Sequence, residues 1–249
     1  MNCPKAILFD LDETLAESFQ SPKPETLVRL AALAALRPVA IISGAGFARI
    51  ESDVLNHLKD AGRLYIFPNS STQCYACKDG IWQQLYNLAL SVDERSHINA
   101  ALLQALEEVP EATGAPHFGE QIVDREAQVA FTVVGLDAPQ EVKMSWDPDR
   151  SKRTAIIGYL QKKLPGFDIL IGGASTIDVT HKDINKAHGV RWFAEHLGFP
   201  ASDMYYVGDA LYPGGNDFVV IDTGITTRIT SGPDETLGII DELLAACVV

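Results

Sequence analysis

The fold is decided by the stretch Ala6-Ile7-Leu8-Phe9-Asp10-Leu11-Asp12-Glu13-Thr14. Its first four residues are apolar without alternation, which is typical of a strand buried on both faces, as in parallel sheets. Asp10 and Asp12 follow at once. Ligand sites of open α/β sheets lie beyond the carboxyl ends of the strands, so we expect these two carboxylates to lie at a functional edge.

The segments that follow continue the alternation of strands and helices. We predict a helix over residues 24–36, with proline in the tolerated first turn, and another over residues 47–58. Apolar runs predict strands at residues 39–42 and 64–67. This order indicates the α/β class, with a doubly wound parallel sheet as the core.

The middle of the chain has a different pattern. Residues 73–82 read as a hairpin, and two predicted helices, 92–108 and 148–164, are each followed by two short strand patterns. Such an order is typical of a small antiparallel sheet with helices on one face. We therefore predict an inserted α+β cap domain over residues 85–180.

The parallel-sheet pattern returns after the insertion. A helix is predicted over residues 185–197 and an apolar strand over 204–207, and apolar segments follow at 218–221 and 225–229. The predicted catalytic core is therefore split between residues 1–84 and 181–249.

The net charge and the apolar stretches of the sequence exclude some classes of binding partner and location. The net charge of −13 argues against a nucleic acid or an anionic membrane as the main partner. The richest apolar stretch, residues 27–42, is interrupted by Arg29 and Arg37, so we expect no transmembrane span. Only four apolar residues follow Lys5, which is too few for a signal peptide. A cytoplasmic location is the expectation that results.

The four cysteines are too few for a disulfide scaffold in a chain of 249 residues. Cys74 and Cys77 form a single closely spaced pair, and a zinc site would need a second pair or histidines at ligand spacing. We therefore expect Cys74 and Cys77 to be packing residues.

The pair Asp10 and Asp12 suits phosphoryl chemistry. One carboxylate can act as nucleophile and the other as proton carrier. Carboxylates so close together repel each other and a phosphate dianion, and a divalent cation relieves both problems. Oxygen-only ligands suit Mg²⁺, so we expect a magnesium site here.

Further polar residues follow the other predicted strands. Ser43 and Gly44 end the second strand, where a hydroxyl and N–H groups can hold phosphate oxygens. Lys186 opens the helix after the insertion and can neutralise both the nucleophile and the phosphate. The loop after residue 207 adds three candidate metal ligands: Asp209, Asn216 and Asp217.

Taken in order, these motifs resemble the haloacid dehalogenase (HAD) superfamily. The set comprises Asp10, Asp12 and Thr14, then Ser43, then Lys186, and finally the acidic loop from Asp209 to Asp217. The insertion resembles the α/β cap of Cof-type phosphatases, sucrose-phosphate phosphatase and eukaryotic-type phosphomannomutase. The resemblance implies catalytic roles for Asp10, Asp12, Thr14, Ser43 and Lys186, and Mg²⁺ held by Asp10, the Asp12 backbone, Asp209, Asn216 and Asp217.

Within that superfamily the sequence is most similar to phosphomannomutase. The run Pro213-Gly214-Gly215-Asn216-Asp217-Phe218 matches that family's signature loop. The resemblance implies substrate-binding roles for Ser43, Gly44, Arg125, Lys143, Thr176 and Asp178. The chain also departs from the mutases, which usually have glycine at position 13 and arginines near positions 19 and 137. Here those positions hold Glu13, Phe19 and Asp137, and Lys143 replaces a further arginine.

These departures favour hydrolysis over isomerisation. A mutase must hold a bis-phosphorylated sugar in two orientations, and arginine is the best clamp for the phosphate that does not react. We therefore expect a magnesium-dependent phosphohydrolase that acts on small phosphate esters such as sugar phosphates, with the mutase as the alternative. A phosphoacceptor signalling domain would be about half as long and lack the insertion. An inactive binding protein would not need this intact set of residues. The oligomeric state stays open.

Overall fold

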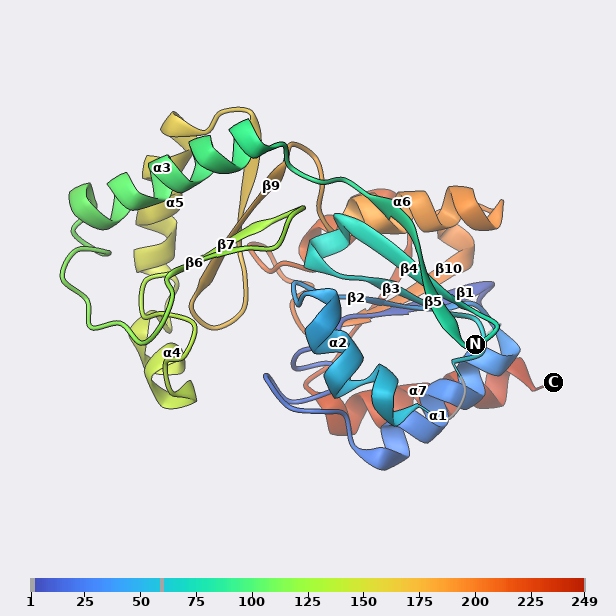
Figure 1. Cartoon of the computed structure of the whole chain (residues 1–249). Helices are drawn as coiled ribbons and strands as arrows, with labels where there is room; N and C mark the ends of the chain where they lie inside the picture. Colours follow the sequence, from blue (N-terminus) through green and yellow to red (C-terminus); the bar gives the residue numbers. More distant parts are fainter. Residues whose placement is uncertain (1–2, 59–60, 249) are drawn as a thin grey trace. The chain divides into compact units, whose positions relative to one another are not determined.

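The computed structural model describes residues 3–58 and 61–248. They form two compact units, one of the described residues up to 87 and from 185 onward, which we call the core unit, and one of residues 88–184, which we call the inserted unit. Figure 1 labels the helices and strands of both.

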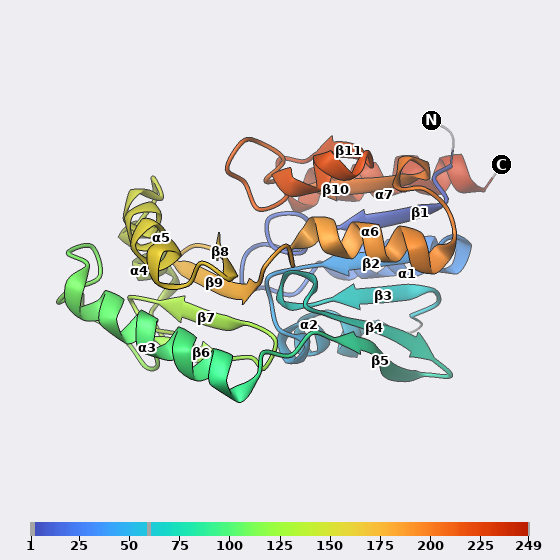
Figure 2. The same cartoon turned by 90° about the horizontal axis from the view of Figure 1, so that it is seen from above.

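The core unit is built on a seven-stranded sheet in the order β11-β10-β1-β2-β3-β4-β5, which Figure 2 shows. The first five strands in this order run parallel, and β4 and β5 close the edge as an antiparallel hairpin. The strand bounds are β1 Ala6–Phe9, β2 Val39–Ile42, β3 Leu64–Phe67, β4 Gln73–Lys78, β5 Ile81–Asn87, β10 Met204–Gly208 and β11 Thr226–Ile229.

Helices cover both faces of this sheet, as Figure 1 shows. Helices α1 (Pro24–Leu36) and α7 (Pro233–Cys247) pack on one face together with α2 (Phe47–Asp53). Helix α6 (Lys186–Leu197) packs on the other face with the short 3₁₀ helix η4 (Phe218–Thr223). The strands in the middle are apolar in every position because both of their faces are covered. The predicted doubly wound α/β class is confirmed.

The inserted unit has a separate antiparallel sheet in the order β6-β7-β9-β8. Helices α3 (Val92–Glu108) and α5 (Ser151–Lys163) pack their apolar sides on one face of it. A short helix, α4 (Gln140–Trp146), was not predicted. The strand bounds are β6 Ile122–Asp124, β7 Val129–Thr132, β8 Phe167–Ile171 and β9 Thr176–His181.

Two details differ from the sequence-based expectations. The helix predicted over residues 47–58 ends at Asp53 and continues as the 3₁₀ turn η1 (Leu55–His57), because the backbone of Val54 leaves helical geometry. Cys3 and Cys247, for which the sequence suggested no pairing, form a disulfide between residues near the two ends of the chain. Cys74 and Cys77 are free, as expected.

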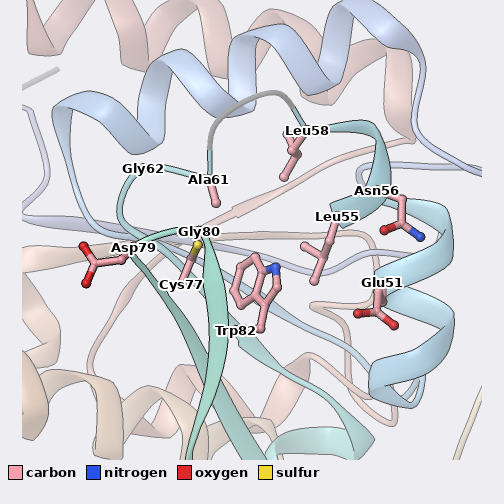
Figure 3. Close-up of a pocket in the computed structure, with 10 residues that line it drawn as sticks. All are labelled: Glu51, Leu55, Asn56, Leu58, Ala61, Gly62, Cys77, Asp79, Gly80 and Trp82. Atoms are coloured by element: carbon pink, nitrogen blue, oxygen red, sulfur yellow. The ribbon is translucent and has the colours of Figure 1, made fainter.

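The described residues contain no helix that is both long enough and apolar enough to span a membrane. The core unit has a cavity of about 540 Å³ whose lining includes Trp82, Cys77 and Glu51 (Figure 3). None of the residues that line it belongs to the predicted catalytic set, so we do not take it as the active site.

Candidate active site

Three buried ionisable side chains meet at the carboxyl edge of the core sheet. Asp10 follows β1 directly, and Lys186 is the first residue of α6. The Lys186 Nζ atom donates to Asp10 Oδ1 and to Asp217 Oδ1, at 2.6 Å in each case. Only 2% of Lys186 and 4% of Asp10 is exposed, so the ammonium group is committed to these two carboxylates.

Asp217 fixes the loop after β10 through its hydrogen bonds. Its Oδ1 also accepts a hydrogen bond from the hydroxyl of Tyr206 at 2.5 Å, and its Oδ2 accepts from the Ala210 backbone N–H at 3.1 Å. The Cβ of any side chain at Gly208 would lie 2.4 Å from Asp217 Oδ2, so this close approach requires glycine. Both oxygens of Asp217 are therefore occupied by protein donors.

Asp209 lies beside Asp10 because β10 pairs with β1 in parallel, with Phe9 opposite Val207. The backbone N–H of Asp209 donates to Thr14 Oγ1 at 3.1 Å, and the Thr14 hydroxyl lies 3.4 Å from Asp209 Oδ1. Thr14 is fully buried, so the third residue of the Asp-x-Asp-x-Thr motif links its loop to the loop after β10.

The negative charges of the carboxylates in this cluster repel one another and shift their pKa values. Burial, and then Asp217 and Asp209, raise the pKa of Asp10 well above its usual range, although Lys186 opposes the shift. Burial and Asp217 likewise raise the pKa of Asp209. Burial alone would lower the pKa of Lys186, but Asp10 and Asp217 hold it above its ordinary value. One ammonium group thus faces three carboxylates.

This donor set fits a divalent cation. Within the described chain, Asp10, Asp209 and Asp217 each offer an oxygen within 4.8 Å of the others. Hard oxygen ligands suit Mg²⁺, and a cation would relieve the repulsion that raises the pKa of Asp10. Asp10 and Asp209 are the better candidates because Asp217 is already saturated by protein donors. Asn216 is exposed in the same loop.

Ser43 and Gly44 follow β2, at the edge where Asp10 follows β1. Ser43 is buried, and its Oγ accepts from the Ala45 backbone N–H at 3.0 Å. The neighbouring turn Asn69–Ser71 has three consecutive residues at positive φ, and the Ser70 N–H donates to the Ser43 carbonyl at 2.8 Å. Such backbone is rare outside glycine and clusters at functional sites. The sequence Asn-Ser-Ser gave no signal for it.

Asp12 is not a member of the carboxylate cluster. Its two side-chain oxygens accept from the guanidinium of Arg49 in α2, Oδ1 from Nη2 at 2.5 Å and Oδ2 from Nη1 at 3.0 Å. Sequence reasoning missed Arg49 altogether. The signal that could have revealed it is its place on the helix that follows Ser43, which faces the loop after β1.

The predicted substrate residues Arg125, Lys143, Thr176 and Asp178 all belong to the inserted unit. Thr176 and Asp178 lie on β9, and burial raises the pKa of Asp178 to about 6 although Arg125 opposes the shift. Arg125 Nη1 donates to Gln128 Oε1 at 2.9 Å. Lys143 lies on α4 and donates to the Leu136 carbonyl at 2.6 Å.

Four buried side-chain polar atoms of this unit have no hydrogen-bond partner among the described residues, and two of them, Asp178 Oδ1 and Gln128 Nε2, belong to the segments of the predicted substrate residues. Because arginine only donates, the bond from Arg125 fixes the Gln128 amide with its oxygen toward Arg125 and its NH₂ group away from it. Asp178 pairs with Ala130 across β9 and β7, two residues beyond Gln128. The sequence gave no reason to select Gln128.

Comparison with known proteins identifies the family. The model of the eukaryotic phosphomannomutase family matches residues 27–246. The chain belongs to this family. It is 24% identical to the phosphomannomutase of Spinacia oleracea and 25% identical to that of Solanum lycopersicum, each over 240 residues, 92% of this chain and 92% and 90% of the relatives.

Solved structures show the same fold. A truncated IMP-nucleotidase of Plasmodium falciparum superposes with a TM-score of 0.73 at 18% identity, over 98% of this chain and 71% of that one. A haloacid dehalogenase-like hydrolase of Bacteroides thetaiotaomicron superposes with a TM-score of 0.66 at 13% identity, over 96% and 99%. The predicted HAD fold and its phosphomannomutase-like branch are confirmed, and the chain is an enzyme of this superfamily by descent.

The loop after β1 contains two of the positions at which the sequence departs from the pattern that the resemblance implies. Glu13 has a φ of 58°, a conformation that favours the glycine expected at this position. The glutamate compensates through its side chain, because Glu13 Oε1 accepts from the Ser18 backbone N–H at 3.0 Å. Phe19, where an arginine was expected, lies under the Arg49 guanidinium with 5.0 Å between the guanidinium carbon and the ring centre.

Proposed function

We propose that this protein is a magnesium-dependent phosphohydrolase of small phosphorylated metabolites, in particular sugar phosphates, that works through a phosphorylated Asp10. The observation that carries the proposal is the buried contact of Asp10 with Lys186, beside Asp209 at the carboxyl edge of the sheet. A buried carboxylate that is held by an ammonium group and crowded by other carboxylates is suited to attack an electrophilic phosphorus rather than to stay solvated.

In the proposed first step, a carboxylate oxygen of Asp10 forms a bond to phosphorus while the bond to the ester oxygen breaks. Asp12 delivers a proton to the leaving oxygen. Lys186 and the groups around Ser43 hold the phosphoryl oxygens. Bound Mg²⁺, with Asp10 and Asp209 as ligands, would supply charge stabilisation to the same oxygens. In the second step water attacks the phosphorus, the Asp10–phosphorus bond breaks, and the water proton passes to Asp12.

We propose that the inserted unit selects the substrate. The orphaned acceptor Asp178 Oδ1 and the orphaned donor Gln128 Nε2 are what a sugar hydroxyl needs, since a hydroxyl both donates and accepts. Arg125 adds one positive charge near them, which suits an anionic sugar. This supports a polyhydroxylated phosphate ester as substrate.

A hexose-phosphate mutase is the second candidate, favoured by the family match and by relatives named phosphomannomutase. It would use the same first step and return the phosphoryl group to another sugar hydroxyl. Against it stand Phe19 and Asp137 at positions where arginines were expected. Lys143 is a weaker substitute for a third, since its ammonium group already donates to a backbone carbonyl.

The test measures phosphate release from a panel of hexose phosphates with and without Mg²⁺, and follows interconversion of the 1- and 6-phosphates in the same samples with a bisphosphate activator. We expect metal-dependent release that Asp10→Asn abolishes. Interconversion with little release would replace the hydrolase by the mutase. Wild-type activity in Asp10→Asn would exclude both.

A further inference from the structure

Asp12 is held by three donors, none of which belongs to the carboxylate cluster. Arg49 binds both of its oxygens in the bidentate geometry that makes arginine–carboxylate pairs strong. The backbone N–H of Phe19 donates to Asp12 Oδ1 at 3.3 Å. Asp12 is half-buried, with 29% of its side chain exposed. The group assigned as proton carrier therefore directs both oxygens to another partner.

Arg49 is itself fixed on its helix. Its Nε atom donates to Asp53 Oδ2, one turn further along α2, at 3.2 Å, and its guanidinium lies over the Phe19 ring. The hydrogen bond from Ser18 to Glu13 closes the loop between Asp12 and Phe19. Two interactions thus orient the guanidinium toward Asp12, and a third fixes the loop between Asp12 and Phe19, before any substrate binds.

We propose that Arg49 is a positioning residue that holds Asp12 away from the reacting atoms and thereby slows hydrolysis of phosphorylated Asp10. This inference rests on the proposed function. In the hydrolytic step a water oxygen bonds to phosphorus, the phosphorus–Asp10 bond breaks, inorganic phosphate leaves, and the water proton passes to an Asp12 oxygen. While Arg49 binds both oxygens, neither is available as the proton acceptor.

The ion pair between Asp12 and Arg49 also affects how long the phosphoryl group stays on Asp10. If Asp12 must leave Arg49 before it can activate water, phosphorylated Asp10 persists longer in the absence of a sugar. A longer-lived phosphorylated enzyme has more time to meet a sugar hydroxyl. Arg49 therefore shifts the balance between hydrolysis and transfer, the property that separates the two candidate activities.

The experiment uses p-nitrophenyl phosphate with Mg²⁺, because p-nitrophenolate leaves without a proton and the first step then bypasses Asp12. Rapid mixing measures the initial burst of p-nitrophenol, which reports phosphorylation of Asp10, and the steady rate that follows, which reports hydrolysis. The phosphorylated enzyme is also quantified by mass spectrometry after acid quenching. The variants are Arg49→Gln and Arg49→Lys. Arg29→Gln is the control, because it breaks another partly exposed arginine–aspartate pair of the core unit, with Asp241, that does not involve Asp12.

We expect Arg49→Gln to raise the steady rate roughly three- to tenfold, because partly exposed ion pairs are weak. The KM should rise in proportion, so that kcat/KM, which reports the first step, stays unchanged, and less phosphorylated enzyme should accumulate. The steady rate of Arg49→Lys, which cannot bind both oxygens in a fork, should fall between those of Arg49→Gln and the wild type, and Arg29→Gln should match the wild type. An unchanged or lower steady rate in Arg49→Gln, with the burst intact, would overturn the holding role alone. A wild-type enzyme that turns over without a burst or detectable phosphorylated Asp10 would overturn the slow hydrolysis that the holding role requires, and turnover that survives Asp10→Asn would overturn the proposed function and this inference together.

Discussion

At the scale of single residues, the decisive feature is that Lys186 is the one cation bonded to the buried carboxylates Asp10 and Asp217 in the described structure. Removing one partner of such a buried group leaves charges without compensation, which costs about 3–5 kcal/mol. We expect Lys186→Met to lower the free energy of unfolding by about this amount at pH 7, and Mg²⁺ to raise its melting temperature more than that of the wild type.

Urea unfolding and thermal melts, each with and without Mg²⁺, measure these effects. Lys5→Met is the matched control, because Lys5 pairs with Asp203 at 2.8 Å where both side chains are at least one third exposed. Exposed pairs contribute at most about 1 kcal/mol. Equal losses in the two variants would contradict the assignment of Lys186 as the compensating charge.

The buried carboxyl group of Asp178 should make the free energy of unfolding depend on pH. The native pKa is raised from 3.8 to about 6, so the native state binds the proton more tightly than the unfolded chain. Asp178 therefore costs no stability below pH 4, and its penalty grows between pH 4 and 6 to about 3 kcal/mol. We expect Asp178→Asn to be more stable than the wild type at pH 7, with a smaller difference at pH 4.5.

Urea titrations at the two pH values measure the difference in free energy of unfolding. Asp183→Asn is the control in the same unit, because Asp183 is exposed and asparagine tolerates its φ of 63°. This variant should change the free energy of unfolding little at either pH. A stability gain in Asp178→Asn that does not vary with pH would show that charge burial is not its cause. If Asp178 binds a sugar hydroxyl, the same variant also raises the KM.

At the scale of elements, the placement of α6 decides whether Lys186 reaches Asp10. Gly189 lies one turn into this helix, and a Cβ there would lie 2.3 Å from Ser71 Oγ and 2.9 Å from Ser71 Cβ. Ser71 is fully buried in the strained turn beside Ser43, so it has little room to move. Helix α6 can therefore pack this closely on the turn only because residue 189 has no side chain.

We expect Gly189→Ala to destabilise the protein by about 1–3 kcal/mol, although alanine is the better helix former by about 1 kcal/mol. Phosphoryl transfer should also slow, since the start of α6 would shift with Lys186. Gly238→Ala is the control in α7, where nothing lies within 4 Å of the added Cβ, and it should be neutral or stabilising. Thermal melts and initial rates of both variants provide the comparison.

At the scale of the whole molecule, the disulfide between Cys3 and Cys247 links residues 244 positions apart. It joins the segment before β1 to the end of α7, and Arg37 Nε donates to Cys3 Sγ at 3.1 Å. Closing so long a loop restricts the unfolded chain, and the chain-entropy model gives a stabilisation on the order of 5 kcal/mol.

We expect Cys3→Ser to lower the melting temperature of the oxidised protein and to abolish the effect of a reductant on it. Cys77→Ser, at a free cysteine, should keep the wild-type response. Melts with and without dithiothreitol measure this, and peptide mapping of the oxidised protein identifies the bond. A reductant effect that survives in Cys3→Ser would exclude this pairing as its source.

The sequence by itself determined the class of fold and the outline of the site. Continuous apolar runs such as residues 6–9 can only be buried on both faces, so they indicated the parallel sheet. Asp10, Ser43 and Asp209 could be predicted to meet because each follows a strand of that sheet, and parallel neighbours end at one edge. These inferences depend on local pattern alone.

The tertiary structure decided which partner each side chain takes. Asp12 was predicted to act beside Asp10, yet it pairs with Arg49, which is 37 residues away. Gln128 and the disulfide were missed for the same reason. The pattern of residues along the chain predicts the helices and strands and the edge at which they end. The partner of a side chain depends instead on contacts between segments far apart in sequence and on which charges are buried together.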